Sequence, residues 1–101
     1  MYIEYYKRLN GTVTSTGVKT LAACGFTPAE IQQADALTLT VRDQEVSIST
    51  TIDNPATDVG HIIKSGDSFN LYLNFNIKNF KMIAALSTAK WTISLGRFYG
   101  K

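Results

Sequence analysis

The segment GHIIKSGDSFNLYL, residues 60–73, places a turn signal between two short stretches of strand-forming residues. Its Lys-Ser-Gly-Asp centre has the chemistry of a tight turn, in which Gly66 supplies a backbone conformation that other residues resist. Phe69, Leu71 and Leu73 recur at the two-residue period of a strand. We therefore predict a hairpin over residues 60–73, with these three apolar side chains filling the core.

Outward from this segment the sequence predicts further strand pairs. Residues 36–41 and 46–51 each alternate apolar and polar side chains on either side of a polar turn, which predicts a hairpin. Residues 81–87 and 90–95 are expected to form the last pair. Both faces of 81–87 are apolar, which is typical of a central or covered strand. The Thr-rich and Ser-rich residues 11–23 predict one or two short strands.

The clearest helix signal is TPAE, residues 27–30. Thr27 has the side chain of an N-cap, Pro28 suits the first helical position, and Glu30 completes a capping box. We expect this helix to continue to about residue 34 and to cover one end of the β structure.

Residues 74–80 are expected to form a short turn anchored by Ile77 and Phe80. With 101 residues, the chain has the size of a single domain, residues 1–101. Strands at nearly regular spacing predict an all-β fold, an antiparallel β-sandwich or jelly-roll-like barrel with one short helix near residues 28–34.

The composition favours a protein that lives in an assembly. Charged residues make up 18% of the chain, below the roughly 25% of ordinary soluble proteins. The charges are also separated by sign along the sequence. Residues 20–67 carry a balance of −5, whereas the residues after 67 carry +5 and no acid. We interpret this separation as favouring the docking of like subunits, with a basic nucleic-acid surface as the alternative.

Both chain ends combine aromatic and basic residues. Residues 1–9 are expected to form a contact arm or an edge strand, and the last six residues repeat the same composition. Tyrosine is favoured at protein interfaces because its ring is apolar while its hydroxyl can bond. The predicted partner-contact residues are Tyr2, Tyr5, Tyr6, Arg97, Phe98 and Tyr99.

The residues offer little for catalysis. Cys24 is the only cysteine, which excludes an intrachain disulfide and a CxxC metal site. His61 is the only histidine, whereas a cupin-type metal site needs two or three. The carboxylates at 43–45 and 53–58 lie in turns, and the second group leaves a weak Ca²⁺ alternative that fits no EF-hand spacing. We expect no catalytic residue, no metal and no cofactor.

The sequence argues against a membrane and against nucleic acid as partners. No apolar run approaches the ~18 residues of a membrane span, and the start lacks the order of a signal peptide, so we expect synthesis in the cytoplasm and no membrane partner. Aromatic and basic residues interleave over 72–81, which leaves open an OB-like binder of single-stranded nucleic acid. Phe75 and Phe80 are expected in the core instead, so nucleic acid is not the expected partner.

From about Gly11 to Tyr99 the chain resembles a family of small β-rich virion proteins of tailed bacteriophages. The resemblance is carried by hydrophobic, glycine and turn positions in five stretches, namely ALTLTVRD (36–43), VSIS (46–49), GHIIKSGDSFNL (60–71), NIKNFKMIA (76–84) and WTISLGRFYG (91–100).

The resemblance implies a non-enzymatic structural protein of a phage particle, made in the host cytoplasm and located in the virion. It implies a head decoration or stabilising protein that docks on other virion proteins, such as the major capsid protein, and that forms a homo-oligomer. The alternatives are a neck or tail component, a receptor-binding or glycan-binding module, or the OB-like single-strand binder.

Overall fold

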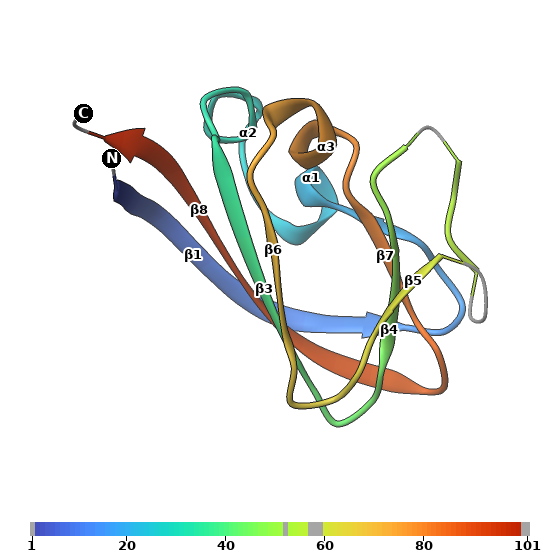
Figure 1. The fold of residues 1–101 in the computed structure, drawn as a ribbon. Helices are drawn as coiled ribbons and strands as arrows, with labels where there is room; N and C mark the ends of the chain where they lie inside the picture. The colour runs from blue at the N-terminus through green and yellow to red at the C-terminus, as the bar shows by residue number, and fades with distance from the viewer. Residues whose placement is uncertain (1, 52, 57–59, 100–101) are drawn as a thin grey trace.

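A computed structural model describes residues 2–51, 53–56 and 60–99, and in these ranges the chain is mostly β structure (Figure 1). It has two antiparallel four-stranded sheets, with strand orders β1-β8-β3-β6 and β2-β7-β4-β5. The described elements, in chain order, are β1 (Tyr2–Thr14), β2 (Lys19–Thr20), α1 (Leu21–Cys24), α2 (Pro28–Gln32), β3 (Ala36–Arg42), β4 (Val46–Ser49), β5 (His61–Ile63), β6 (Ser68–Leu71), α3 (Asn74–Lys78), β7 (Lys81–Ala84) and β8 (Thr88–Tyr99).

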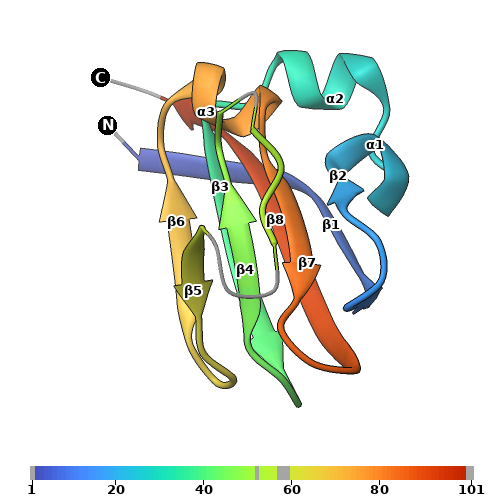
Figure 2. The same ribbon diagram turned by 90° about the vertical axis from the view of Figure 1, so that its right-hand side faces the viewer.

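The three predicted hairpins are wrong, because in each case the two strands lie in different sheets. β3 pairs with β8 and β6, while β4 pairs with β5 and β7. The turn of residues 64–67 therefore joins β5 of one sheet to β6 of the other, and β7 and β8 are separated in the same way. In Figure 2 the β5-β4-β7-β2 sheet lies in front of the β6-β3-β8-β1 sheet.

The error has a simple physical origin. An alternating strand shows which side chains face the core, but this pattern is the same whether the next strand pairs beside it or crosses to the opposite sheet. Leu39 on β3 and Ile48 on β4 are both fully buried and belong to one core cluster, although they lie in different sheets. A chain that crosses between the sheets keeps the same apolar pattern as a hairpin.

The core takes side chains from both sheets and from the segments that carry the helices. Trp91, Ile93 and Leu95 are buried on one face of β8, as the sequence predicted. β7 is a central strand with Met82, Ile83 and Ala84 buried, which confirms the covered strand predicted from its two apolar faces. Phe69 and Leu71 pack against the core, but Leu73, the third side chain expected there, is 58% exposed.

The helix predicted after Thr27 is confirmed as α2, and it ends at Gln32. The Thr27 Oγ1 accepts a hydrogen bond from the Glu30 N–H (3.2 Å), and the Thr27 N–H donates to Glu30 Oε1 (2.9 Å). Because the backbone N–H of Thr27 stabilises the charged carboxylate, the pKa of Glu30 is lowered.

The prediction of a single helix is wrong, because α1 and α3 also form. α1 occupies the end of residues 11–23, where only strands were expected. The Thr20 side chain accepts a hydrogen bond from the Ala23 N–H (3.2 Å), and Gly25 closes the helix with a φ of 114°. α3 takes the place of the turn predicted over residues 74–80, and its anchors Ile77 and Phe80 are buried as expected.

Residues 2–9, expected as an arm or an edge strand, belong to edge strand β1, which pairs with β8 along its whole length. A bulge between Tyr5 and Lys7 shifts the register. Tyr6 and Leu9 pack against the core, so this segment is part of the fold and not a detachable arm. β3 pairs with β8 up to Gly96, and beyond that point the ends of β1 and β8 continue as a projecting ribbon (Figure 1).

The connection between β4 and β5 approaches the second sheet closely. The Lys81 ammonium on β7 donates to the carbonyl oxygens of Thr51 (2.6 Å) and Asp53 (3.3 Å). Gly60, at the end of this connection, has a φ of 124°, and a Cβ there would lie 2.6 Å from the carbonyl oxygen of Ile48. Only a residue without a side chain fits at this position.

The turn chemistry of residues 64–67 is confirmed even though the hairpin is not. Gly66 has a φ of 91°, and the Asp67 N–H donates to the Lys64 carbonyl oxygen (3.0 Å). The Gly66 N–H donates to the carbonyl oxygen of Val41 (2.7 Å), which fixes the turn against β3.

Gly66→Val is therefore expected to lower the free energy of unfolding by about 1–2 kcal/mol, because a β-branched residue resists a positive φ. Gly17→Val is the control, since Gly17 has neither a positive φ nor a neighbour within 4 Å of an added Cβ. Urea unfolding of both variants measures the difference. Equal midpoints for the two variants would contradict the assignment of strain to Gly66.

Candidate functional site

The predicted contact residues from the two chain ends come together on one ribbon. In the β1/β8 ladder Tyr2 pairs with Tyr99, and the pairs that follow join residues 3 with 98, 4 with 97 and 5 with 96. Tyr2, Tyr5, Tyr6, Arg97 and Phe98 thus lie at the same end of the molecule, as does the backbone of Tyr99. The side chain of Tyr99 is outside the described part of the structure.

Tyr6 and Arg97 hold the ribbon to α2. The Tyr6 hydroxyl donates to the Glu30 carbonyl oxygen (2.5 Å). Arg97 lies 5.2 Å from the centre of the Tyr6 ring, donates to Gln33 Oε1 (3.1 Å) and forms an ion pair with Glu4 (3.7 Å). Burial raises the pKa of Tyr6, against the opposing effect of the Arg97 charge. Both side chains are therefore engaged within the fold.

Tyr5 lies on the outer side of the first sheet and is 47% exposed. A Cβ at Gly96 would lie 3.0 Å from the Tyr5 ring, so the ring passes over this glycine. Its hydroxyl is 2.9 Å from Thr38 Oγ1, and the Thr38 hydroxyl donates to Asn70 Oδ1 (2.8 Å). Because Thr38 has one hydroxyl proton, Tyr5 must be the donor to it. This chain of hydrogen bonds fixes the ring while leaving about half of it accessible.

Sequence reasoning missed three exposed apolar residues that follow β6, the third of them within α3. Tyr72 is 53% exposed, Leu73 58% and Phe75 64%. Leu73 and Phe75 were expected in the core, and both expectations are wrong. When several large apolar side chains with this exposure lie together, they are typical of an interaction surface.

Asn74 explains why its neighbours point outward. Its Nδ2 lies within hydrogen-bond distance of the carbonyl oxygens of Ile31 (3.2 Å), Gln32 (3.2 Å) and Ala34 (2.6 Å) at the end of α2. One amide thus contacts carbonyl oxygens at the end of α2, where helix carbonyls commonly lack intrahelical partners, although the Ile31 carbonyl also accepts from the Ala34 N–H (3.3 Å). With Asn74 directed at α2, the side chains on either side of it are left at the surface. The sequence signal for this arrangement was the polar Asn74 within the otherwise apolar run of residues 71–75.

The antiparallel register brings six exposed apolar residues to one end of the molecule. β1 begins, β8 ends, β3 begins and β6 ends there, as Figures 1 and 2 both show. Of the nine large apolar residues found exposed in the described part of the chain, the six at this end are Tyr2, Tyr5, Tyr72, Leu73, Phe75 and Phe98. We call these six residues the aromatic end.

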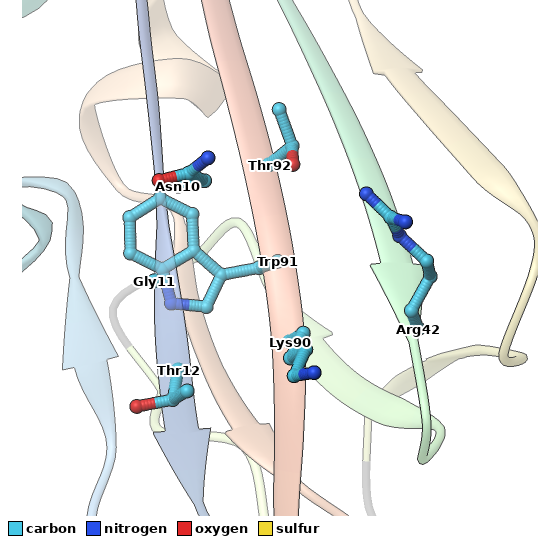
Figure 3. Close-up of a pocket in the computed structure, with 7 residues that line it drawn as sticks. All are labelled: Asn10, Gly11, Thr12, Arg42, Lys90, Trp91 and Thr92. Carbon is cyan, nitrogen blue, oxygen red and sulfur yellow. The ribbon is translucent and has the colours of Figure 1, made fainter.

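A shallow pocket of about 270 Å³ lies across β1, β8 and β3, well away from the aromatic end (Figure 3). It is lined by Asn10, Gly11, Thr12, Arg42, Lys90, Trp91 and Thr92. The polar side chains come from register pairs on neighbouring strands, with residue 90 on β8 between residues 12 and 42, and residue 10 beside 92.

Trp91 supports this region from the core side. Its ring packs against Gly11, where a Cβ would lie only 2.8 Å from Cζ2. The Lys19 ammonium lies 5.9 Å from the centre of the indole ring and donates to the Thr12 carbonyl oxygen (2.9 Å). The indole N–H is buried and has no hydrogen-bond partner among the described residues. Trp91 is thus a core residue beneath β1.

The chemically reactive side chains are dispersed. Burial raises the pKa of the Cys24 thiol to about 11, so it stays protonated near neutral pH. His61 is exposed on β5. Within the described ranges no group of three or more His, Cys, Asp or Glu residues is placed to hold a metal ion. Asp58, one of the loop carboxylates considered for Ca²⁺, lies outside these ranges.

The separation of charge along the sequence is partly neutralised within the fold. Lys90 pairs with Asp43 (3.5 Å), and Arg97 with Glu4 (3.7 Å). Both pairs join a cation of the basic last third to an acid from earlier in the chain. Exposed pairs of this kind contribute about 0–1 kcal/mol each to stability. Their main effect is to reduce the positive charge that a partner molecule can contact.

Comparison with protein families, curated proteins and solved structures found no match for this chain. Among the described residues no helix has the length and apolar character needed to cross a membrane.

Proposed function

We propose that this protein is a non-enzymatic structural protein that attaches to the particle of a tailed bacteriophage through its aromatic end. The observation that carries the proposal is the gathering of six exposed apolar side chains at one end of the molecule. Aromatic residues are enriched in the buried centres of protein interfaces, where they contribute most of the binding energy.

The arrangement of the aromatic end supports a preformed contact surface. Tyr5 is fixed by its hydrogen bond to Thr38, and Asn74 holds Leu73 and Phe75 in place through its bonds to α2. Side chains that are already ordered lose less conformational entropy on binding. The resemblance to small phage virion proteins supplies the kind of partner, another virion protein such as the major capsid protein. We also propose that copies of the chain associate with one another in the particle.

The strand orders support a finer proposal for the fold, a jelly-roll sandwich. A jelly roll has eight strands in two four-stranded sheets, with strands paired in a nested order. The pairs β1/β8, β2/β7, β3/β6 and β4/β5 have this nesting. Viral capsid proteins use this architecture, and so do lectins. The fold is therefore compatible with the proposed role but does not by itself select it.

The double substitution Leu73→Ser with Phe75→Ser is expected to reduce attachment to phage particles at least tenfold. Each side chain loses apolar area whose burial contributes about 1.5–3 kcal/mol. Tagged variants expressed in infected host cells would be quantified by mass spectrometry in particles purified on a density gradient.

Leu86→Ser is the control, because Leu86 is at least as exposed (67%) and lies in the β7–β8 connection, at the opposite end of the sheets. It should co-purify with particles like the parent chain. Absence of the parent chain from particles, or equal recovery of the double variant and the parent, would overturn the proposal.

A further inference from the structure

The outer side of the β1-β8-β3-β6 sheet carries a continuous polar surface. Trp91, Ile93 and Leu95 point into the core, so the residues between them on β8 point outward. The register places Ser94 beside Arg8 and Thr92 beside Asn10 on β1. These rows lie about 6–7 Å apart along the strands, and they carry hydroxyl, amide and guanidinium groups.

Two pockets lie along β1 and β8. One of about 270 Å³ lies over Asn10, Thr92, Lys90 and Arg42, and a second of about 300 Å³ includes Arg8, Ser94 and Tyr5 among its lining residues. The rows of Asn10 and Arg8 are consecutive on β1, so the two pockets lie over neighbouring rows of β1 and β8. We call the two pockets together the track. Because the track extends over more than one row of side chains, it suits a linear chain of small units better than a single ion.

The charge of the track is positive. Arg8 and Arg42 are exposed, and neither forms an ion pair with a carboxylate in the described ranges. Lys90 is paired with Asp43 at 3.5 Å, and both of these side chains are more than half exposed. The guanidinium group is suited to paired hydrogen bonds with a carboxylate or sulfate. The track thus complements a ligand with negative groups spaced along it.

We propose that this track binds a linear acidic polysaccharide. The two arginines would hold the acidic groups, while Asn10, Thr92 and Ser94 would bond the neutral hydroxyls between them. Tyr5, fixed in orientation and about half exposed, presents a ring on which the apolar face of a sugar can stack. This site goes beyond the proposed attachment to a particle. It shares Tyr5 with the aromatic end but does not include Leu73 or Phe75.

The composition of the track favours a saccharide over single-stranded nucleic acid. A nucleic-acid groove combines many cations along the backbone with aromatic rings for successive bases. Of the three aromatic residues that line the two pockets, Trp91 is buried and Tyr6 is bonded to α2, which leaves the Tyr5 ring accessible for stacking. Of the four cations, Lys7 and Lys90 already pair with Glu30 and Asp43. Neutral hydrogen-bonding groups are as frequent as charges, which matches a sugar ring with one acid and several hydroxyls.

Isothermal titration calorimetry at low salt with a six-unit oligogalacturonate tests the proposal. The parent chain is expected to bind it and not to bind neutral maltohexaose. Arg42→Gln should weaken binding about tenfold, since it removes a charge-assisted hydrogen bond. Asp43→Asn should tighten binding, because it frees Lys90 and keeps a residue that tolerates the positive φ of 76° at this position.

Lys78→Gln is the matched control, since it removes one exposed positive charge from α3 and should leave the affinity within twofold. Thermal unfolding of each variant checks that these surface changes keep the fold. Absence of binding, equal affinity for maltohexaose, or an unchanged affinity in Arg42→Gln would overturn the proposal. Tighter binding of a seven-nucleotide thymidine oligomer, which also carries six negative groups, would replace the saccharide with nucleic acid. Particle attachment is measured separately, so either proposal can fail alone.

Discussion

Gly60→Ala is expected to lower the free energy of unfolding by about 3 kcal/mol. Two costs combine at this position. The φ of 124° is strained for any residue with a side chain, and the added Cβ would lie 2.6 Å from the Ile48 carbonyl oxygen and 2.7 Å from Ser47 Oγ. Strained backbone and overpacking each cost about 1–3 kcal/mol. Since the main obstacle is backbone of the central strand β4, it cannot move aside as a flexible side chain would.

Two glycines separate these costs experimentally. Gly66→Ala meets a φ of 91° with no atom near the new Cβ, so it should cost about 1 kcal/mol. Gly17→Ala has neither problem. It should be neutral or slightly stabilising, because alanine lowers the conformational entropy of the unfolded chain. Urea unfolding of the three variants should rank Gly60→Ala as the least stable by a clear margin. A cost for Gly60→Ala no greater than that for Gly66→Ala would mean that the close approach to β4 is wrong.

Asn74→Asp is expected to destabilise the protein by about 3 kcal/mol at neutral pH. The Asn74 amide donates to carbonyl oxygens at the end of α2, at 2.6 Å for Ala34 and 3.2 Å for both Ile31 and Gln32. A carboxylate has no proton to donate, and it would place a negative charge against these oxygens. Asn76→Asp adds the same charge in the same helix, where the side chain has no hydrogen-bond partner among the described residues, and should stay within about 0.5 kcal/mol.

The pH dependence gives this prediction a second readout. The carbonyl oxygens disfavour the charged form, so the folded-state pKa of the new carboxyl should lie above the unfolded value of about 3.9. The penalty should therefore be full above the folded pKa and shrink as the pH falls towards the unfolded pKa, where the neutral carboxyl again donates one hydrogen bond. Chemical denaturation between pH 4 and 7 measures this change relative to the parent. A penalty that does not vary with pH would contradict the proposed contacts.

Local chemistry in this chain could be predicted from the sequence. The capping box of Thr27 and Glu30 depends on side chains three residues apart, and the turn at Gly66 depends on one glycine. The buried face of Trp91, Ile93 and Leu95 follows from a two-residue period. In each case the cause and the effect lie within a few residues.

The pairing of the strands could not be predicted in the same way. One partner of β3 is β8, about fifty residues later, and nothing within residues 36–42 records that distance. The same limit applies to the aromatic end. Leu73 and Phe75 looked like core residues because their environment is decided by Asn74 and its bonds to the distant end of α2. The contact residues at the chain ends were chosen by composition, and their pairing on one ribbon emerged only from the register of β1 and β8.

The position of β8 between β1 and β3 has a consequence for folding of the nascent chain on the ribosome. Among the described strands β8 is synthesised after the other seven, yet it is the strand that joins β1 to β3 in the first sheet. During synthesis β1 therefore has no partner strand in its sheet until β8 has left the ribosome, and contacts between segments so far apart in the sequence are slow to form. A fragment that stops before β8 would leave β1 unpaired within the first sheet.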